Sequence, residues 1–124
     1  MSSVRWFVGR LLLTLNRLFS PKPLQRSTVD QARINSEAKE LSLYQFEACP
    51  FCIKVRRTIQ RLNLPIDTYD IKSSRVREQE LIENGGRRRV PCLTIIEDDG
   101  SVAWMYESSD IVAYLEGRFQ PEPA

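Results

Sequence analysis

The sequence has no histidine, and cysteine is scarce, with three residues among 124. A structural zinc site needs four ligands, and Cys92 is the one thiol left to join the pair Cys49 and Cys52, so the sequence argues against a bound metal. Three cysteines are also too few for the disulfide framework of a small secreted protein. We therefore expect a reducing compartment, the cytoplasm, and thiols that work chemically.

Neither sign of charge dominates the sequence, since 18 basic and 16 acidic residues give a formal net charge of +2. Basic residues are spread along the chain apart from a short cluster at Arg87, Arg88 and Arg89, so nothing favours nucleic acid as a partner. A composition of 42% hydrophobic and 27% charged residues is typical of a folded globular domain. We expect such a domain over residues 41–124, as a monomer.

Long apolar runs are absent as well. The most apolar stretch, "VRWFVGRLLLTLNRLF" at residues 4–19, is interrupted by Arg5 and Arg10. As a helix it would be about 24 Å long at 1.5 Å per residue, shorter than the roughly 30 Å hydrocarbon core of a bilayer. The run also lacks a small-residue cleavage site of the kind that follows a signal peptide. We expect neither a transmembrane span nor a signal peptide.

On a helical wheel this segment is amphipathic, with arginines on one face and a broad apolar face opposite. The apolar face comprises Val4, Phe7, Val8, Leu11, Leu12, Leu15, Leu18 and Phe19. Such a helix suits peripheral contact with the inner, anionic face of a membrane. Packing on its own domain or on a second copy fits equally well. Residues 1–40 are therefore predicted to form an amphipathic helix and a linker that leads into a short polar helix.

From Leu41 the pattern changes to short alternating elements. We expect strands at 41–46, 65–71, 92–97 and 101–106, and helices starting at Cys49-Pro50, at Ser73 or Ser74 and at Ser108 or Ser109. The turn residues at 98–100 join the last two strands as a hairpin. The order β-α-β-α-β-β-α predicts an α/β fold with one mixed sheet whose first pair is parallel.

The motif "CPFC" places Cys49 at the start of a helix and Cys52 one turn later. Unpaired backbone N–H groups and the positive end of the helix dipole stabilise a thiolate there. Cys49 is thus the candidate nucleophile, and Cys52, on the buried side of the helix, is the candidate resolving thiol. A structural disulfide across such a tiny loop would gain little stability.

Three segments in this order, "CPFC", "GGRRRVPCL" and "ESSDIVAYL", make residues 41–124 resemble a glutaredoxin, a member of the thioredoxin fold. The resemblance implies a dithiol glutathione-dependent oxidoreductase that reduces protein disulfides or glutathionylated proteins, with glutathione as co-substrate. It also implies a cis peptide bond at Val90-Pro91 that faces the cysteines, and Arg87 and Arg88 as ligands of the glycine carboxylate of glutathione.

Alternatives stay open for this motif. A trans proline and a solvated basic turn would explain the same residues. An iron–sulfur cluster shared by two copies, with Cys49 and glutathione as ligands, occurs in relatives of the glutaredoxins. A membrane-attached glutathione-binding module without turnover is a third possibility.

Glu107-Ser108 departs from the glutaredoxin pattern and resembles the motif of glutathione transferase N-terminal domains, where the serine binds the γ-glutamyl carboxylate of glutathione. The start of a helix is a ready anion site, so Ser108 and Ser109 suit that ligand, although helix capping alone would also explain them. Because the chain ends soon after Phe119, we expect no all-helical second domain.

The loop before the motif departs from the family too, because Gln45 and Glu47 stand where many glutaredoxins have a lysine. Glu47 would oppose ionisation of Cys49, which leaves Lys54 and Arg88 as the expected compensating charges. Lys54, Arg56, Arg57, Gln60 and Arg61 are expected on the solvent face of the helix. Phe51 is predicted to be exposed beside the thiols, and Cys92 to be a small core residue.

Overall fold

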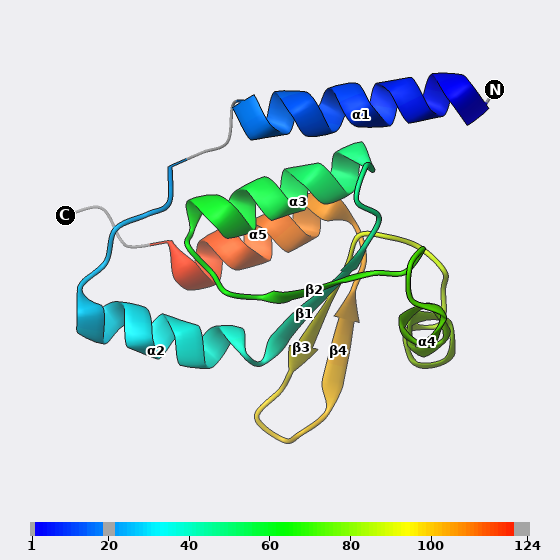
Figure 1. The fold of residues 1–124 in the computed structure, drawn as a ribbon. Helices are drawn as coiled ribbons and strands as arrows, with labels where there is room; N and C mark the ends of the chain where they lie inside the picture. The colour runs from blue at the N-terminus through cyan, green and yellow to red at the C-terminus, as the bar shows by residue number, and fades with distance from the viewer. Residues whose placement is uncertain (1, 19–21, 121–124) are drawn as a thin grey trace.

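The computed structural model describes residues 2–18 and 22–120. Its elements are α1 (Ser2–Leu18), α2 (Thr28–Ala38), β1 (Leu41–Gln45), α3 (Pro50–Arg61), β2 (Asp67–Asp70), α4 (Arg75–Glu80), η1 (Leu81–Gly85), β3 (Cys92–Ile96), β4 (Val102–Met105) and α5 (Ser108–Phe119). Figure 1 shows α3 and α5 side by side against the sheet, with α4 away from them and α1 above α3.

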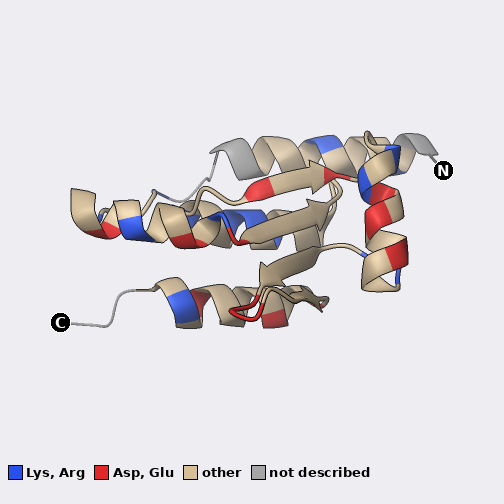
Figure 2. Cartoon of the chain, turned by 90° about the horizontal axis from the view of Figure 1, so that it is seen from below, with Lys and Arg blue, Asp and Glu red and all other residues tan. Residues whose placement is uncertain are grey.

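The four strands form one sheet in the order β2-β1-β3-β4. β1 pairs with β2 in parallel, while the β1–β3 and β3–β4 pairs are antiparallel. This mixed sheet and the order β-α-β-α-β-β-α confirm the predicted topology, which is that of the thioredoxin-like fold. Figure 2 shows basic and acidic residues interspersed over the helices that surround the sheet.

Each face of the sheet is covered by a separate cluster of apolar side chains. The larger cluster joins Leu43 and Leu93 of the sheet to Val55 of α3 and Leu115 of α5. The smaller cluster lies on the opposite face, because successive side chains of a strand alternate. It comprises Tyr44, Ile71, Leu81 and Cys92. The prediction that Cys92 is a buried core residue is therefore confirmed, at 0% exposure.

The predicted helix after Ser73 or Ser74 is two elements in the structure. The Ser74 hydroxyl accepts a hydrogen bond from the Arg77 N–H at 3.3 Å and caps α4. The helix then widens into the π-helical turn η1 rather than continuing as a regular α-helix. Gly86 ends it with φ 90°, a left-handed conformation that glycine adopts at little cost.

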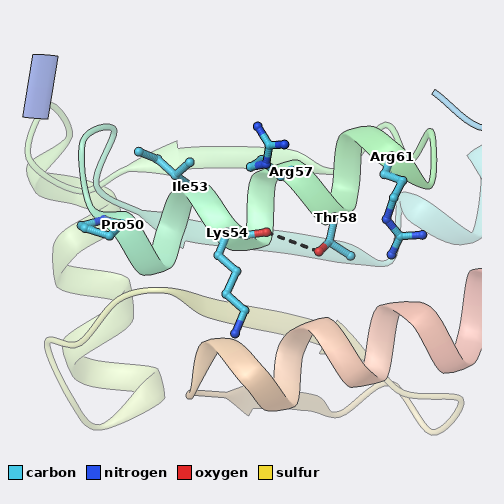
Figure 3. A pocket seen from close by; sticks show the side chains of 6 residues that line it. All are labelled: Pro50, Ile53, Lys54, Arg57, Thr58 and Arg61. Atoms are coloured by element: carbon cyan, nitrogen blue, oxygen red, sulfur yellow. Dashed lines mark hydrogen bonds between the residues drawn. The ribbon is translucent and has the colours of Figure 1, made fainter. Parts of the chain in front are cut away.

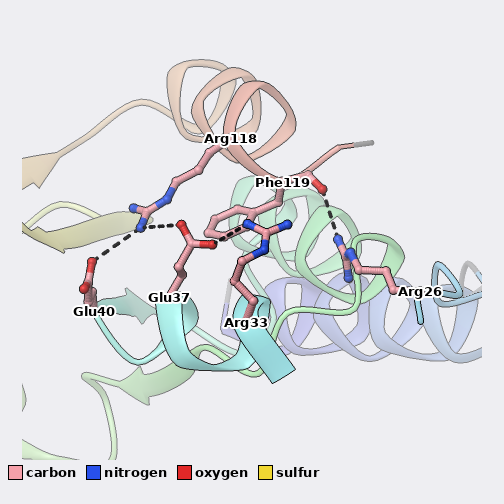
Figure 4. Close-up of polar contacts among 6 residues, drawn as sticks. All are labelled: Arg26, Arg33, Glu37, Glu40, Arg118 and Phe119. Carbon is pink, nitrogen blue, oxygen red and sulfur yellow. Dashed lines mark hydrogen bonds and ion pairs between the residues drawn. The ribbon is translucent and has the colours of Figure 1, made fainter. Parts of the chain in front are cut away.

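The polar helix α2 belongs to the main core, although its sequence suggested only a short helix in a linker. Ile34 and Ala38 are 3% and 0% exposed and lie in the larger apolar cluster. Figure 4 shows the polar contacts beside them, in which Arg118 of α5 reaches Glu37 at 3.5 Å and Glu40 at 3.4 Å. In the same view the Arg26 guanidinium donates to the Phe119 carbonyl at 3.0 Å.

The N-terminal helix α1 packs on the loop that precedes α3. Gly9 is buried there, and a Cβ atom built on it would lie 2.9 Å from the Cβ of Ala48. Leu12 is half-buried on the same side, whereas Phe7 and Leu11 are 66% and 58% exposed.

The packing side of α1 is thus narrower than the predicted apolar face, much of which is exposed. The side chain of Leu18 and residue Phe19 lie outside the described part of the chain. Among residues 2–18 and 22–120, no helix combines the length and apolar character that crossing a bilayer requires.

Candidate functional site

The two motif cysteines lie at the start of α3, as predicted. Cys49 is the residue just before the helix, with φ −77° and ψ 127°, and Pro50 takes the first helical position. Cys49 is half-buried, whereas Cys52 is 0% exposed. All three cysteines are free thiols. A reagent from solution therefore reaches Cys49 before Cys52.

The environment of Cys52 keeps that thiol protonated at neutral pH. Burial raises the pKa of Cys52 to about 12, the Phe46 N–H counteracts part of this, and the neighbouring Cys49 adds to it. The Phe46 N–H donates to the Cys52 sulfur at 3.4 Å. Because a negative charge on Cys49 opposes one on Cys52, the two thiols do not readily carry a negative charge at the same time.

Arg56 is the cation beside the thiols, and the sequence placed it wrongly on the solvent face. Its guanidinium donates to the Phe46 carbonyl at 3.2 Å and to the Glu47 carbonyl at 2.5 Å, and it also bonds the Gln45 side chain. Burial lowers the pKa of Arg56, while Cys52, Glu47 and Cys49 raise it. Arg56 thus holds the loop before Cys49 and supplies positive potential to both sulfurs.

Lys54 does not share this position. Figure 3 shows its side chain extending from α3 toward α5, along a shallow hollow of about 430 Å³. Pro50, Ile53, Lys54, Arg57, Thr58 and Arg61 line that hollow. Arg56, and not Lys54, is the cation that interacts electrostatically with both sulfurs. Phe51 is 62% exposed, as predicted for a contact surface beside the thiols.

The three arginines of the basic turn have three different partners. Arg87 stacks over the Tyr106 ring at 4.8 Å. Arg88 lies 5.4 Å from the centre of the Phe46 ring and forms an ion pair with Glu78 at 3.0 Å. Arg88 therefore reaches the loop before Cys49, as the sequence led us to expect, but a carboxylate already engages it.

Arg89, which the sequence analysis did not select, pairs with Glu107 at 3.1 Å. This contact joins the turn before β3 to the start of α5. The Val90–Pro91 peptide bond lies between them along the chain and is cis, as the glutaredoxin resemblance implied. Val90 is half-buried and Pro91 is buried. The position of Arg89 could not be read from the sequence because three consecutive arginines offer no pattern that separates them.

The start of α5 differs from the prediction. Glu107, not Ser108 or Ser109, is the residue before the helix, and no side chain caps it. Glu107 has φ 69°, a conformation that non-glycine residues adopt at a cost, and such strain clusters at functional sites. Ser108 and Ser109 occupy the first two helical positions, where backbone N–H groups lack helical partners. The first turn of α5 thus offers backbone N–H groups of the kind that can bind an anion.

Comparisons with known proteins agree with this geometry. Residues 43–123 match the family model described as "Glutathione S-transferase, N-terminal domain". The chain is 35% identical over 114 residues to mouse prostaglandin E synthase 2, and the alignment covers 92% of this chain and 26% of that protein. It is 28% identical over 100 residues to protein URE2 of Candida albicans, and the alignment covers 79% of this chain and 28% of that protein. The chain thus spans about a quarter of the length of these relatives.

Solved structures of maleylacetoacetate isomerase from Anaeromyxobacter dehalogenans also align with the chain. One has 27% identity and a TM-score of 0.49, and the alignment covers 68% of this chain and 37% of that one. A second, with bound dicarboxyethyl glutathione and citrate in its active site, has 26% identity and a TM-score of 0.47, with 68% and 38% covered.

Proposed function

Because this chain belongs to the family of glutathione S-transferase N-terminal domains, a glutathione-binding family, we propose that it catalyses glutathione-dependent thiol–disulfide exchange at Cys49. The family is the one to which Glu107-Ser108 pointed, and the glutaredoxin-type activity is our proposal beyond it. The observation that carries the proposal is the half-buried Cys49 at the start of α3, beside a buried thiol and the Arg56 guanidinium. A helix start and a nearby cation are the features that make a cysteine nucleophilic.

The proposed reaction removes glutathione from a mixed disulfide. The Cys49 thiolate attacks the glutathione sulfur, the substrate thiol leaves and takes a proton from water, and Cys49 now carries glutathione. A second glutathione thiolate then attacks the sulfur of that bound glutathione, which releases oxidised glutathione and restores Cys49. Over the two steps the mixed disulfide and one glutathione thiol become the substrate thiol and oxidised glutathione, so one S–S bond replaces another and the exchange balances.

Cys52 plays a secondary role in this scheme. Once Cys49 is bonded to glutathione, its negative charge is gone and one of the contributions that raise the pKa of Cys52 is removed. Burial remains, however, and keeps the thiolate form of Cys52 scarce at neutral pH. We propose that glutathione resolves the intermediate in most turnovers and that Cys52 acts on protein disulfides.

The glutathione would lie between the cis Val90-Pro91 turn and the start of α5. Backbone N–H groups of Ser108 and Ser109 suit a carboxylate, and Arg87, Arg88 and Arg89 bring positive charge to the same side. The Val90 backbone suits pairing with the extended peptide. Glu107 holds Arg89 in place rather than binding the ligand directly.

The test is turnover of a glutathione mixed disulfide, coupled through glutathione reductase to NADPH. We expect Cys49→Ser to abolish turnover and Cys52→Ser to keep it. Cys92→Ala is the matched control, because Cys92 lies in the separate cluster under η1. If the Cys49→Ser variant turned over the mixed disulfide as fast as the native chain, the proposal would be wrong. A glutathione-linked dimer with visible absorbance after anaerobic purification, and no turnover, would favour the iron–sulfur carrier instead.

A second function, membrane attachment, is favoured by the exposed side of α1. Phe7 and Leu15 are 66% and 41% exposed on a helix that also carries Arg5 and Arg10, a combination typical of interfacial helices. We propose peripheral binding to anionic bilayers through this side. The native chain should sediment with vesicles that contain phosphatidylserine and less so at high salt. Phe7→Ser should weaken this binding, and equal sedimentation with neutral vesicles would contradict the role of the arginines.

A further inference from the structure

α1 and the loop before α3 enclose a groove of about 650 Å³ with Cys49 in its wall. The groove is lined by Val4, Leu12 and Leu13 of α1 and by Phe46, Cys49 and Pro50 of the facing segment, among others. None of the residues proposed to hold glutathione lines it. In the proposed reaction Cys49 would therefore lie between two binding surfaces, the proposed glutathione site at the cis-proline turn and this groove under α1.

The groove exists because α1 is held close to this loop. Gly9 allows the backbone of α1 to approach Ala48, since a Cβ there would lie 2.9 Å from the Cβ of Ala48. Leu12 and Leu13 are then half-buried along the groove instead of facing solvent. A wall of leucine, valine and phenylalanine side chains favours an apolar occupant, because each buried methylene group contributes to binding.

The charged side chains around the groove indicate that one end of the occupant is anionic. Arg5, Arg10 and Lys72 line it together with Glu47 and Asp70, which leaves an excess of one positive charge. Arg10 stacks over Trp6 at 5.5 Å and Lys72 over Phe46 at 4.6 Å. Within residues 2–18 and 22–120, none of these three cations forms an ion pair with a carboxylate. Cations stacked on rings at the border of an apolar groove suit an anionic group.

We propose that this groove binds the leaving half of the mixed disulfide, and that it selects thiols whose apolar carbon chain ends in an anionic group. The inference rests on the proposed function and adds the substrate class. During attack by Cys49 on the glutathione sulfur, the thiol R–S⁻ leaves into the groove under α1 and takes its proton from water. Glutathione stays on the opposite side, where a second glutathione completes the cycle.

The test compares three glutathione mixed disulfides on the full-length chain, made with 8-mercaptooctanoate, 8-mercaptooctanol and 2-mercaptoethanol. We expect kcat/KM for the octanoate compound to exceed that for the mercaptoethanol compound by at least about tenfold, with the octanol compound between them. Leu12→Ser should remove most of this preference. Leu11→Ser is the matched control, because Leu11 is the neighbouring leucine, 58% exposed and outside the groove lining. Equal kcat/KM for all three compounds would overturn the inference.

A binding measurement separates failure of this inference from failure of the proposed function. Trp6 lines the groove, so its fluorescence should change as the unreactive S-methyl-8-mercaptooctanoate is added, and this change should be absent in Trp6→Phe and weakened in Leu12→Ser. A fluorescence response without turnover of any disulfide would refute the proposed function and keep the groove as a binding site. Turnover without a fluorescence response would refute the groove and keep the proposed function.

Discussion

α1 and α2 both precede the sheet along the chain, but they meet the rest of the molecule in different ways. α1 is the more apolar helix and leaves Phe7 66% and Leu11 58% exposed. α2 is more polar and buries Ile34 and Ala38 to 3% and 0% exposure. Apolar content therefore does not decide which helix joins the core. Two apolar side chains one turn apart, Ile34 and Ala38, place α2 in the core, and polar contacts with α5 hold it there.

The largest expected effect contrasts one residue of each helix. We expect Ile34→Ala to lower the free energy of unfolding by roughly 2–5 kcal/mol, because it leaves a cavity in the main core. Leu11→Ala removes a comparable side chain from the exposed side of α1 and should cost less than about 0.5 kcal/mol. Urea denaturation followed by circular dichroism measures both. A similar loss for the two variants would mean that α1 is as much part of the core as α2.

The next effect concerns a thiol of the interior and depends on pH. Burial raises the pKa of Cys92 from 9.0 to about 12. The folded state therefore binds this proton more tightly than the unfolded chain, so stability is intact below pH 9 and falls as the pH rises toward 12. For one such thiol the loss is about 1.4 kcal/mol at pH 10.

Cys52 has a pKa raised in the same direction, to about 12, so the native chain should lose stability from both thiols over this range. In Cys92→Ala the fall should be shallower, whereas the two proteins should keep a constant difference in unfolding free energy below pH 8. The measurement is urea unfolding at several pH values. Parallel curves up to pH 11 would show that Cys92 is not a source of the alkaline loss.

A smaller effect tests the polar contacts that fix α2. Arg118 reaches Glu37 and Glu40 from α5, and its side chain is 23% exposed (Figure 4). Arg118→Gln should cost about 1 kcal/mol of unfolding free energy, the upper range for a partly exposed pair. Arg33 pairs with Glu37 within α2 and is 65% exposed, so Arg33→Gln is the control and should cost almost nothing. Equal costs would indicate that charge, rather than the link between helices, matters.

Much of the fold could be predicted because its signals are local. The stretch at 41–46 indicates a buried strand, and four of the five residues of β1 are buried. A spacing of three or four along α3 places Cys52, Val55 and Ile59 on one side, and all three are buried. Turn residues also act locally, as Gly86 shows with φ 90°. Such features depend on a few neighbouring residues, so they can be read without knowing what packs against them.

The remainder depends on contacts between segments far apart in the sequence. Arg56 lies on the polar side of α3, but the loop at Phe46 and Glu47 folds over it and accepts its hydrogen bonds. At α5, Glu107 takes the position before the helix in a strained conformation, where serine was the expected cap. For α1, the pattern gave an amphipathic helix but could not show that Gly9 is its point of contact. The sequence thus locates the proposed nucleophile, Cys49, more readily than the residues that surround it.

The smallest expected effect on stability is the sharpest test of how α1 is placed. In Gly9→Ala the new Cβ would lie 2.9 Å from the Cβ of Ala48, closer than such atoms approach, so α1 must shift from the loop. Alanine also favours a helix over glycine by about 1 kcal/mol, so α1 itself should persist. We expect the unfolding free energy to change by less than about 0.5 kcal/mol, while alkylation of Cys49 by iodoacetamide becomes faster, because the groove wall retreats from the sulfur.

The matched variant is Ala48→Gly, which removes the opposing Cβ. If direct contact between the two positions holds α1, the double variant Gly9→Ala/Ala48→Gly should return the alkylation rate of Cys49 to that of the native chain, because one Cβ again fills the space between the backbones. If the effects of the two single substitutions on the alkylation rate simply add in the double variant, the two positions act independently and other contacts hold α1 over the loop. Restoration would show that one pair of small residues sets the distance between α1 and Cys49, while the core, α2 included, stays unchanged.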